Sequence, residues 1–170
     1  PEVYILRKAI SRFHDIDFRN ILVGEGIDGL ISNIARLLIN VGDKVVSSLG
    51  GYPTFDYHIF SAGGDVISVP YANDLENLNG LIEAAQIHRP RLLYIVNPDN
   101  PMGTWWTGKK IEELIENIPS ETLVILDEAY FEFAPDEAIA AINPENPKVI
   151  RFRTFSKAYG LAGLRVGYAI

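Results

Sequence analysis

Short apolar runs alternate with segments of helical periodicity along most of this 170-residue chain. Brief turns rich in Gly, Pro and Asn separate them, as expected where strands and helices alternate. We predict strands at residues 21–23, 44–49, 66–69, 91–96, 122–126, 149–153 and 164–169, and helices at residues 3–10, 30–39, 75–88 and 109–118. Alternation of this kind builds a parallel sheet that is covered on both faces. The expected fold class is therefore α/β, a three-layer αβα domain with a mostly parallel sheet of about seven strands.

Composition narrows the function classes. With 48% hydrophobic and 22% charged residues, the chain suits one globular domain, and its net charge of −7 disfavours nucleic acid and anionic membranes as partners. No apolar run approaches the roughly 20 residues of a membrane span. The chain has no cysteine, and its three histidines, His14, His58 and His88, show no ligand spacing. We therefore expect no metal site and a cytoplasmic protein.

The segment 154–167 holds the most promising chemistry. Lys157 follows the apolar run 149–152 and lies among hydroxyl and glycine residues. Thr154 and Ser156 can bind phosphate oxygens, and the Arg165 guanidinium suits a phosphate dianion. A lysine beside cations and away from bulk water has its amine form favoured, as a Schiff-base lysine requires. Together these residues suggest a pyridoxal phosphate site, although a surface lysine at a strand-to-helix junction is the simpler interpretation of Lys157 alone.

The pattern Ser-Lys-x-x-Gly-Leu-x-Gly-x-Arg-x-Gly, which begins at Ser156, resembles the lysine motif of the class I/II aminotransferases. These are fold-type I enzymes that use pyridoxal 5'-phosphate, and residues 153–165 are most similar to the histidinol-phosphate aminotransferase branch. The resemblance implies that Lys157 holds the cofactor covalently and then moves a proton at the substrate α-carbon. It also implies that Arg165, Ser156 and Thr154 bind the cofactor phosphate.

A glycine-rich turn, residues 24–29, joins a predicted strand to a predicted helix and also reads G-x-G-x-x-G. Such a turn points backbone amides and a helix dipole at an anion. It can be a purely structural turn, or a dinucleotide site, which requires an acid at the end of the next strand. That strand ends in Gly50-Gly51, and Asp43 precedes it instead. The dinucleotide reading is therefore disfavoured.

Beside the lysine motif, this turn resembles the aminotransferase loop Gly-x-Gly-Ser-Asp-Glu. By that resemblance, Gly26, Ile27 and Asp28 cradle the cofactor phosphate. Ile27 stands where the family usually has a small residue, and Gly29 where it often has Glu. The implied role therefore belongs to the backbone.

Three further segments follow predicted strands. Taken alone, residues 97–103 are a turn, an aromatic in 51–57 is a core residue, and Asp127 is either a helix cap or a ligand at the carboxyl end of a buried strand. The aminotransferase resemblance gives them cofactor roles. Asp127 pairs with the pyridinium nitrogen, Asn100 and Tyr130 hydrogen-bond the 3-hydroxyl, and Phe55 stacks on the ring.

The resemblance implies transamination between a small-molecule amino donor, histidinol phosphate or a related amino compound, and the 2-oxo acid 2-oxoglutarate. Residues 1–170 would be the large cofactor-binding domain, without an N-terminal arm or a C-terminal small domain, and the enzyme would be a homodimer. Two alternatives stay open. One is a decarboxylase or lyase of the same fold, and the other is a shortened domain that binds the cofactor without catalysis.

Overall fold

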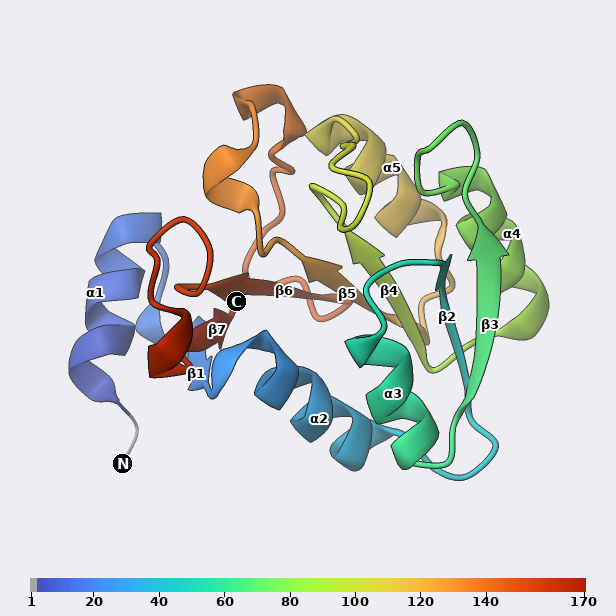
Figure 1. Ribbon diagram of the computed structural model, residues 1–170, viewed down its shortest axis with the longest axis horizontal. Helices are drawn as coiled ribbons and strands as arrows, with labels where there is room; N and C mark the ends of the chain where they lie inside the picture. Colours follow the sequence, from blue (N-terminus) through green and yellow to red (C-terminus); the bar gives the residue numbers. More distant parts are fainter. Residues whose placement is uncertain (1–2) are drawn as a thin grey trace.

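In the computed structural model, which describes residues 3–170, seven strands form one sheet with helices on both faces (Figure 1). The strands are β1 (Leu22–Gly24), β2 (Lys44–Leu49), β3 (Asp65–Pro70), β4 (Leu92–Val96), β5 (Leu123–Asp127), β6 (Val149–Thr154) and β7 (Gly167–Ala169). The helices are α1 (Tyr4–His14), α2 (Gly26–Leu38), α3 (Thr54–Ser61), α4 (Leu78–His88) and α5 (Gly108–Asn117). Single 3-10 turns span Phe18–Asn20, Phe131–Phe133, Asp136–Ala138 and Ala162–Leu164.

The strand order is β1-β7-β6-β5-β4-β2-β3. Strands β2 to β6 run parallel to one another, whereas β7 is antiparallel to both β6 and β1. This arrangement confirms the expected mostly parallel α/β sheet. Because all five parallel strands end at the same edge, the segments that follow them gather there.

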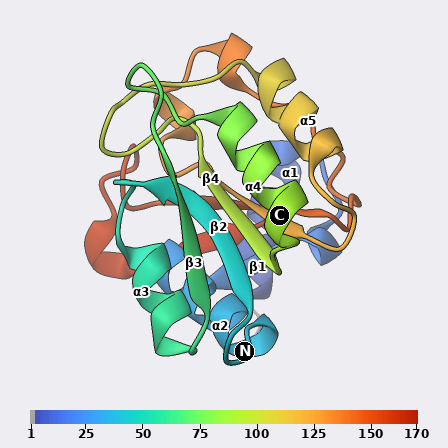
Figure 2. The ribbon, with the colours of Figure 1, turned by 90° about the vertical axis from the view of Figure 1, so that its right-hand side faces the viewer.

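Alternating side chains of the sheet feed two cores. Helices α4 and α5 cover one face, where Leu93 and Ile95 of β4 pack with Leu81 and Leu114. Helices α2 and α3 cover the other, where Tyr94 and Val96 belong to a second cluster. Figure 2 shows the two helical layers on either side of the sheet. No helix among residues 3–170 is long and apolar enough to cross a membrane.

Four helices differ clearly from the sequence prediction. Helix α1 ends at His14 instead of residue 10, and α4 begins at Leu78 instead of residue 75, since the Asn77 side chain caps its first turn. Helix α3 begins at Thr54, inside a segment that we expected to be a turn, because its aromatic and β-branched residues are weak helix formers. Helix α2 begins at Gly26. The prediction placed its start at residue 30, since the glycines of the first turn have a low helix propensity. The last predicted strand is shorter than expected, since Ala162–Leu164 forms a 3-10 turn and Arg165 has a φ of 49°.

The sheet loosens between β2 and β4, where the strand order reverses. These strands pair through Val45–Leu92 and Val46–Leu93, near their starts. Towards the end of β4, the Val96 N–H donates instead to Glu76 Oε2 at 3.1 Å. The Glu76 side chain is buried, and this burial raises the pKa of its carboxyl group to about 8. The Glu76 side chain thus accepts a hydrogen bond that a neighbouring strand would otherwise accept, at the point where the strand order reverses. Open α/β sheets bind ligands at such a point.

Glu76→Gln should change how stability depends on pH. The Glu76 carboxyl has an ordinary pKa of 4.5 and a folded-state pKa of about 8, so the folded chain binds this proton more tightly than the unfolded chain. The contribution of this proton to the free energy of unfolding is complete below the ordinary pKa and is lost as the pH rises through the folded-state pKa. An amide keeps the acceptor for Val96 but cannot ionise. The stability of the variant relative to the parent should therefore increase between about pH 5 and pH 9 in thermal unfolding.

Glu83→Gln is the matched control, because Glu83 is an exposed glutamate on α4. Its stability difference from the parent should vary little over the same pH range. A Glu76→Gln difference that is equally flat would show that Glu76 does not hold its proton in the folded chain.

Candidate functional site

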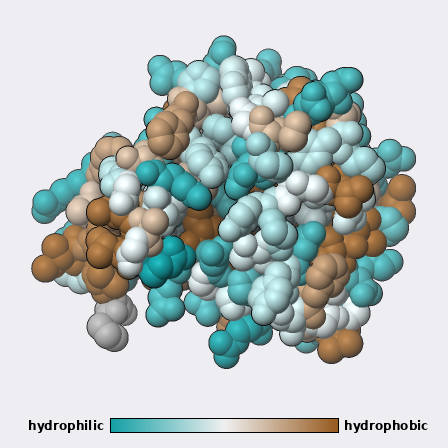
Figure 3. All heavy atoms as spheres, in the orientation of Figure 1, coloured by the Kyte–Doolittle hydropathy of each residue, from teal (hydrophilic) through white to brown (hydrophobic). Residues whose placement is uncertain are grey.

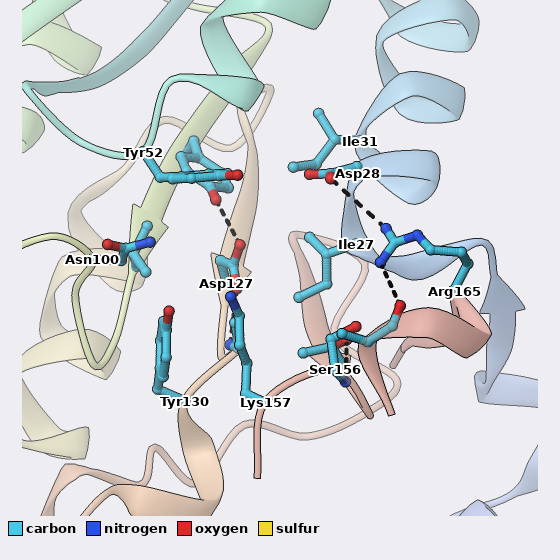
Figure 4. Close-up of a pocket in the computed structure, with 15 residues that line it drawn as sticks. Ile27, Asp28, Ile31, Tyr52, Asn100, Asp127, Tyr130, Ser156, Lys157 and Arg165 are labelled. Carbon is cyan, nitrogen blue, oxygen red and sulfur yellow. Dashed lines mark hydrogen bonds and ion pairs between the residues drawn. The ribbon is translucent and has the colours of Figure 1, made fainter. Parts of the chain in front are cut away.

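A cavity of about 210 Å³ lies at the carboxyl ends of β4, β5 and β6, beside the first turn of α2 (Figure 4). The residues that line it come from these elements and the loops after them: Ile27, Asp28, Ile31, Tyr52, Tyr94, Val96, Asn100, Asp127, Ala129, Tyr130, Thr154, Ser156, Lys157, Ala162 and Arg165. They include nine of the eleven residues that the sequence singled out. Of the other two, Gly26 lies beside the cavity and Phe55 does not reach it.

Asp127 is the buried acid of the cavity. It is the last residue of β5, with a relative exposure of 6%. Its Oδ1 accepts a hydrogen bond from Ala129 N at 2.9 Å, and its Oδ2 accepts one from the Tyr94 hydroxyl at 2.6 Å. Burial raises the pKa of Asp127 from 3.8 to about 6, against the effect of these hydrogen bonds. A cationic partner in the cavity would therefore stabilise the ionised carboxylate.

Phe55 does not stack on anything in the cavity, which contradicts the role expected for it. Helix α3 turns this ring into the core, where it is 1% exposed and stacks on Tyr94 with centroids 4.2 Å apart and planes 6° apart. The aromatic residue at the cavity wall is Tyr52, which precedes α3 and is half exposed. The sequence alone does not distinguish the roles of these two aromatic residues, because the start of α3 between them decides which ring is buried.

Lys157 and Tyr130 extend side by side into the cavity in Figure 4, with the ammonium nitrogen 5.3 Å from the ring centroid. Tyr130 follows β5 and is half-buried, as is Asn100 after β4. Lys157 is exposed, contrary to the expectation of a lysine held away from water. The described residues form the floor and walls around it without covering it.

The opposite end of the cavity is suited to an anion. Gly26, with a φ of 75°, opens α2, and the Glu25 side chain makes no capping hydrogen bond there. The first amides of a helix have no partners within the helix, so the N–H groups of Ile27 and Asp28 remain available to a ligand. Arg165 Nη2 lies 3.9 Å from Asp28 Oδ2, so its guanidinium reaches the same turn.

Two glycines make this arrangement possible. A Cβ atom on Gly26 would lie 2.6 Å from Arg165 Nη2, and one on Gly167 of β7 would lie 3.0 Å from Ile27 N. Both contacts are too close for any larger residue without movement of its neighbour. The glycine turn, Arg165 and β7 therefore form one packed unit.

Thr154 and Ser156 both line the cavity, but they differ in what their hydroxyl groups are free to do. Thr154 is buried, and its Oγ1 donates to Val166 O at 3.3 Å and accepts from Ser156 N at 3.1 Å. It therefore holds the turn after β6 rather than offering a free hydroxyl. Ser156 is half-buried and stays a candidate ligand.

Two groups near Asp127 were not predicted from the sequence. One is Tyr94, a single polar tip within the apolar strand Leu92–Val96, and a buried tyrosine hydroxyl normally requires a partner. The other is Asn97, whose amide accepts from Trp106 N at 2.8 Å and donates to Trp106 O and Ala138 O, both at 3.0 Å. Asn97 thereby fixes the loop that carries Asn100. Among residues 3–170, no three His, Cys, Asp or Glu side chains gather as a metal centre requires.

Several known proteins resemble this chain. A family model for aminotransferase class I and II matches residues 3–170. Histidinol-phosphate aminotransferase from Staphylococcus haemolyticus is 38% identical over 97% of this chain and 48% of its own length. Histidinol-phosphate aminotransferase 2 from Carboxydothermus hydrogenoformans is 37% identical over 96% of this chain and 46% of its own length. The chain thus spans about half the length of the curated relatives it matches.

Solved structures agree with this relationship. The crystal structure of histidinol-phosphate aminotransferase from Sinorhizobium meliloti in complex with pyridoxal-5'-phosphate superposes with a TM-score of 0.98. It is 49% identical and is covered over 47% of its length by the whole of this chain. L-threonine-O-3-phosphate decarboxylase from Porphyromonas gingivalis, at 24% identity and a TM-score of 0.84, shares the fold over 100% of this chain and 52% of its own.

The match of the family model to almost the whole chain confirms the resemblance carried by the lysine, aspartate and glycine-loop segments. The chain belongs to the class I and II aminotransferases, in the histidinol-phosphate aminotransferase branch.

Proposed function

We propose that this chain forms the pyridoxal 5'-phosphate site of an aminotransferase that acts on histidinol phosphate, or a related amino compound, and 2-oxoglutarate. The observation that carries the proposal is the meeting of Lys157, Asp127 and the Gly26–Arg165 anion pocket around one cavity. Relatives named histidinol-phosphate aminotransferase support the choice of substrate. Because these relatives are about twice as long, the chain would correspond to their large, cofactor-binding domain.

The residues present fit this cofactor. Its phosphate requires donors and positive charge, which the first turn of α2 and Arg165 provide, and the missing Gly26 side chain leaves room beside the guanidinium. Its aldehyde requires an accessible amine, which Lys157 provides. Its protonated ring nitrogen requires a buried carboxylate, and Asp127 is the buried carboxyl group of the cavity.

When bound, pyridoxal phosphate supplies a ring that accepts the electrons released at the substrate α-carbon. Lys157 would bond the aldehyde carbon, yield to the incoming amino group and then move the proton at the α-carbon. Asp127 would hold the proton on the ring nitrogen, and Tyr130 and Asn100 would donate to the 3-oxygen. Tyr52, rather than Phe55, would cover the ring.

We also propose that the full-length protein is a cytoplasmic homodimer, which its sedimentation mass and cell fractionation would test. Apolar side chains are exposed on several parts of the surface, and two of these parts are large enough to consider as contacts. One lies over α1 and the turn Ala162–Leu164, where Ile5 and Leu164 are 86% and 65% exposed (Figure 3). The other includes Val41 after α2 and Phe60 on α3, at 88% and 61%. Exposed apolar surface of this kind supports contact with a second chain.

Lys157→Ala should abolish covalent attachment of the cofactor. The chain mixed with pyridoxal phosphate should show a visible absorption band, and borohydride reduction followed by peptide mapping should place the adduct on Lys157. Lys109→Ala, which removes an exposed lysine on α5, should behave like the parent. A band of parental strength in the Lys157 variant would refute the proposed role of this residue.

Cofactor affinity should fall as the pH decreases through about 6, the pKa of Asp127. Above that pH the carboxylate can pair with a cationic ring nitrogen, and below it the neutral acid cannot. Asp127→Asn should weaken binding at neutral pH and remove the part of the pH dependence that belongs to Asp127, leaving the part due to the phosphate. Titrations of pyridoxal phosphate binding between about pH 5 and pH 8 measure this difference. Parallel pH curves for the two proteins would contradict the pairing.

Gly26→Ala should reduce pyridoxal phosphate affinity by an order of magnitude or more, on the order of 1–2 kcal/mol, since a Cβ atom in the left-handed region is strained and would push Arg165 away. Gly29→Ala is the control. Its Cβ atom would meet Glu25 Cβ at 3.1 Å, within a helix that tolerates alanine. Fluorescence titration with the cofactor compares the two. Equal affinities would show that the Gly26 turn does not bind the phosphate.

A further inference from the structure

We propose that Tyr94 is a positioning residue that keeps Asp127 ionised and oriented for a cationic ring nitrogen. The inference rests on the proposed function for its catalytic meaning. Its structural part, the hold of Tyr94 on Asp127, is a property of the chain without cofactor. This residue lies outside the segments that carry the lysine, glycine-loop and aspartate motifs.

The contact is short and shielded from water. The Tyr94 hydroxyl donates to Asp127 Oδ2 at 2.6 Å, and Tyr94 is 6% exposed. Hydrogen bonds to a charged acceptor are stronger than neutral ones, more so at low local dielectric. Ala129 N donates to the other oxygen, so each Asp127 oxygen has a fixed donor before any ligand enters. The carboxylate can rotate away from the cavity only by giving up both bonds.

Phe55 holds the phenol ring in this position. The Phe55 and Tyr94 rings stack with their planes 6° apart and their centroids 4.2 Å apart. Phe55 itself is fully buried in the core between α3 and α2. The aromatic residue that the sequence suggested as a ring-stacking partner of the cofactor thus acts one layer further in, as the support of Tyr94.

The Tyr94 hydroxyl keeps its proton near neutral pH and therefore remains a hydrogen-bond donor. Burial, followed by the charge of Asp127, raises the pKa of its hydroxyl well above 10. The other carboxyl groups that act on this pair are Glu76, Asp28 and Glu128, and all of them oppose a further negative charge. Burial and these charges raise the pKa of Asp127, while the Tyr94 hydrogen bond lowers it.

The balance sets what Asp127 can do. With the Tyr94 donor present, the pKa of Asp127 is about 6, and the group is ionised at neutral pH. Without the Tyr94 hydrogen bond, burial and the neighbouring carboxyl groups would raise the pKa of Asp127 further, and more of the group would be neutral. A neutral acid cannot neutralise a protonated ring nitrogen, so the electron-accepting strength of the bound ring depends on this tyrosine.

Tyr94→Phe tests the inference, because it removes one oxygen and keeps the stacked ring. In protein labelled with ¹³C at aspartate carboxyl carbons, the Asp127 resonance is assigned by its loss in Asp127→Asn. Its titration midpoint should rise by about one pH unit or more in Tyr94→Phe without cofactor. With pyridoxal phosphate, the acidic decline in affinity should move towards neutral pH by the same amount. In the full-length enzyme, kcat should fall at least 10-fold with little change in KM.

Two control variants separate this effect from general disturbance. Tyr71→Phe removes a similar hydroxyl, which donates to Asp99 at 2.9 Å, and should leave the Asp127 midpoint unchanged. Phe55→Leu keeps the Tyr94 hydroxyl but removes its support, and should raise the midpoint by a smaller amount than Tyr94→Phe. An Asp127 midpoint that is the same in Tyr94→Phe and the parent would overturn the inference, even if the cofactor still attaches to Lys157. A raised midpoint with no attachment at Lys157 in the parent would refute the proposed function and leave the hold of Tyr94 on Asp127 standing.

Discussion

A buried ion pair between neighbouring strands holds the two chemical halves of the site together. Glu128, directly after β5, accepts hydrogen bonds from Arg151 at 2.9 and 3.1 Å and from Arg153 at 2.8 Å, both on β6. Glu128 and Arg153 are almost completely buried, so loss of Glu128 would leave the Arg153 charge uncompensated in the interior. The residue before Glu128 is the acid of the cavity, and the segment after Arg153 carries the lysine. The pair therefore fixes the register on which their separation depends.

The topology of the sheet supplies the rest of the site. Parallel strands end at one edge, and the reversal of strand order between β2 and β4 opens a gap there that Glu76 partly fills. The antiparallel return of β7 brings Arg165 and Gly167 to the glycine turn at the start of α2. Each functional group is therefore held by a regular element or by a turn with internal hydrogen bonds. The exposed Lys157 segment is the least enclosed part of the site.

The sequence predicts correctly those site residues whose position follows from the local pattern of apolar and polar residues. Asp127, Asn100 and Lys157 each follow an apolar strand, and strand ends converge whatever the details of packing. The sequence does not predict the roles of residues whose orientation depends on tertiary contacts. Phe55 and Tyr52 lie close together in the sequence, and the helix that begins between them sends one ring to the core and leaves the other at the cavity. Thr154 was expected to offer a free hydroxyl, but the return of the chain at Val166 binds it. Tyr94 gave only a weak signal, because its partner lies on a different strand.

The approach of Gly167 to the Gly26 turn also bears on the order in which the site is built. The two glycines are far apart in the sequence, and their backbones touch with no side chain between them. Contacts between residues so distant in sequence form late, because the entropy of closing a long loop must be overcome first. The glycine turn is synthesised before Arg165 and Gly167, which supply its guanidinium and its packing partner. The anion pocket is therefore a product of chain closure, and a nascent chain gains it only when β7 docks.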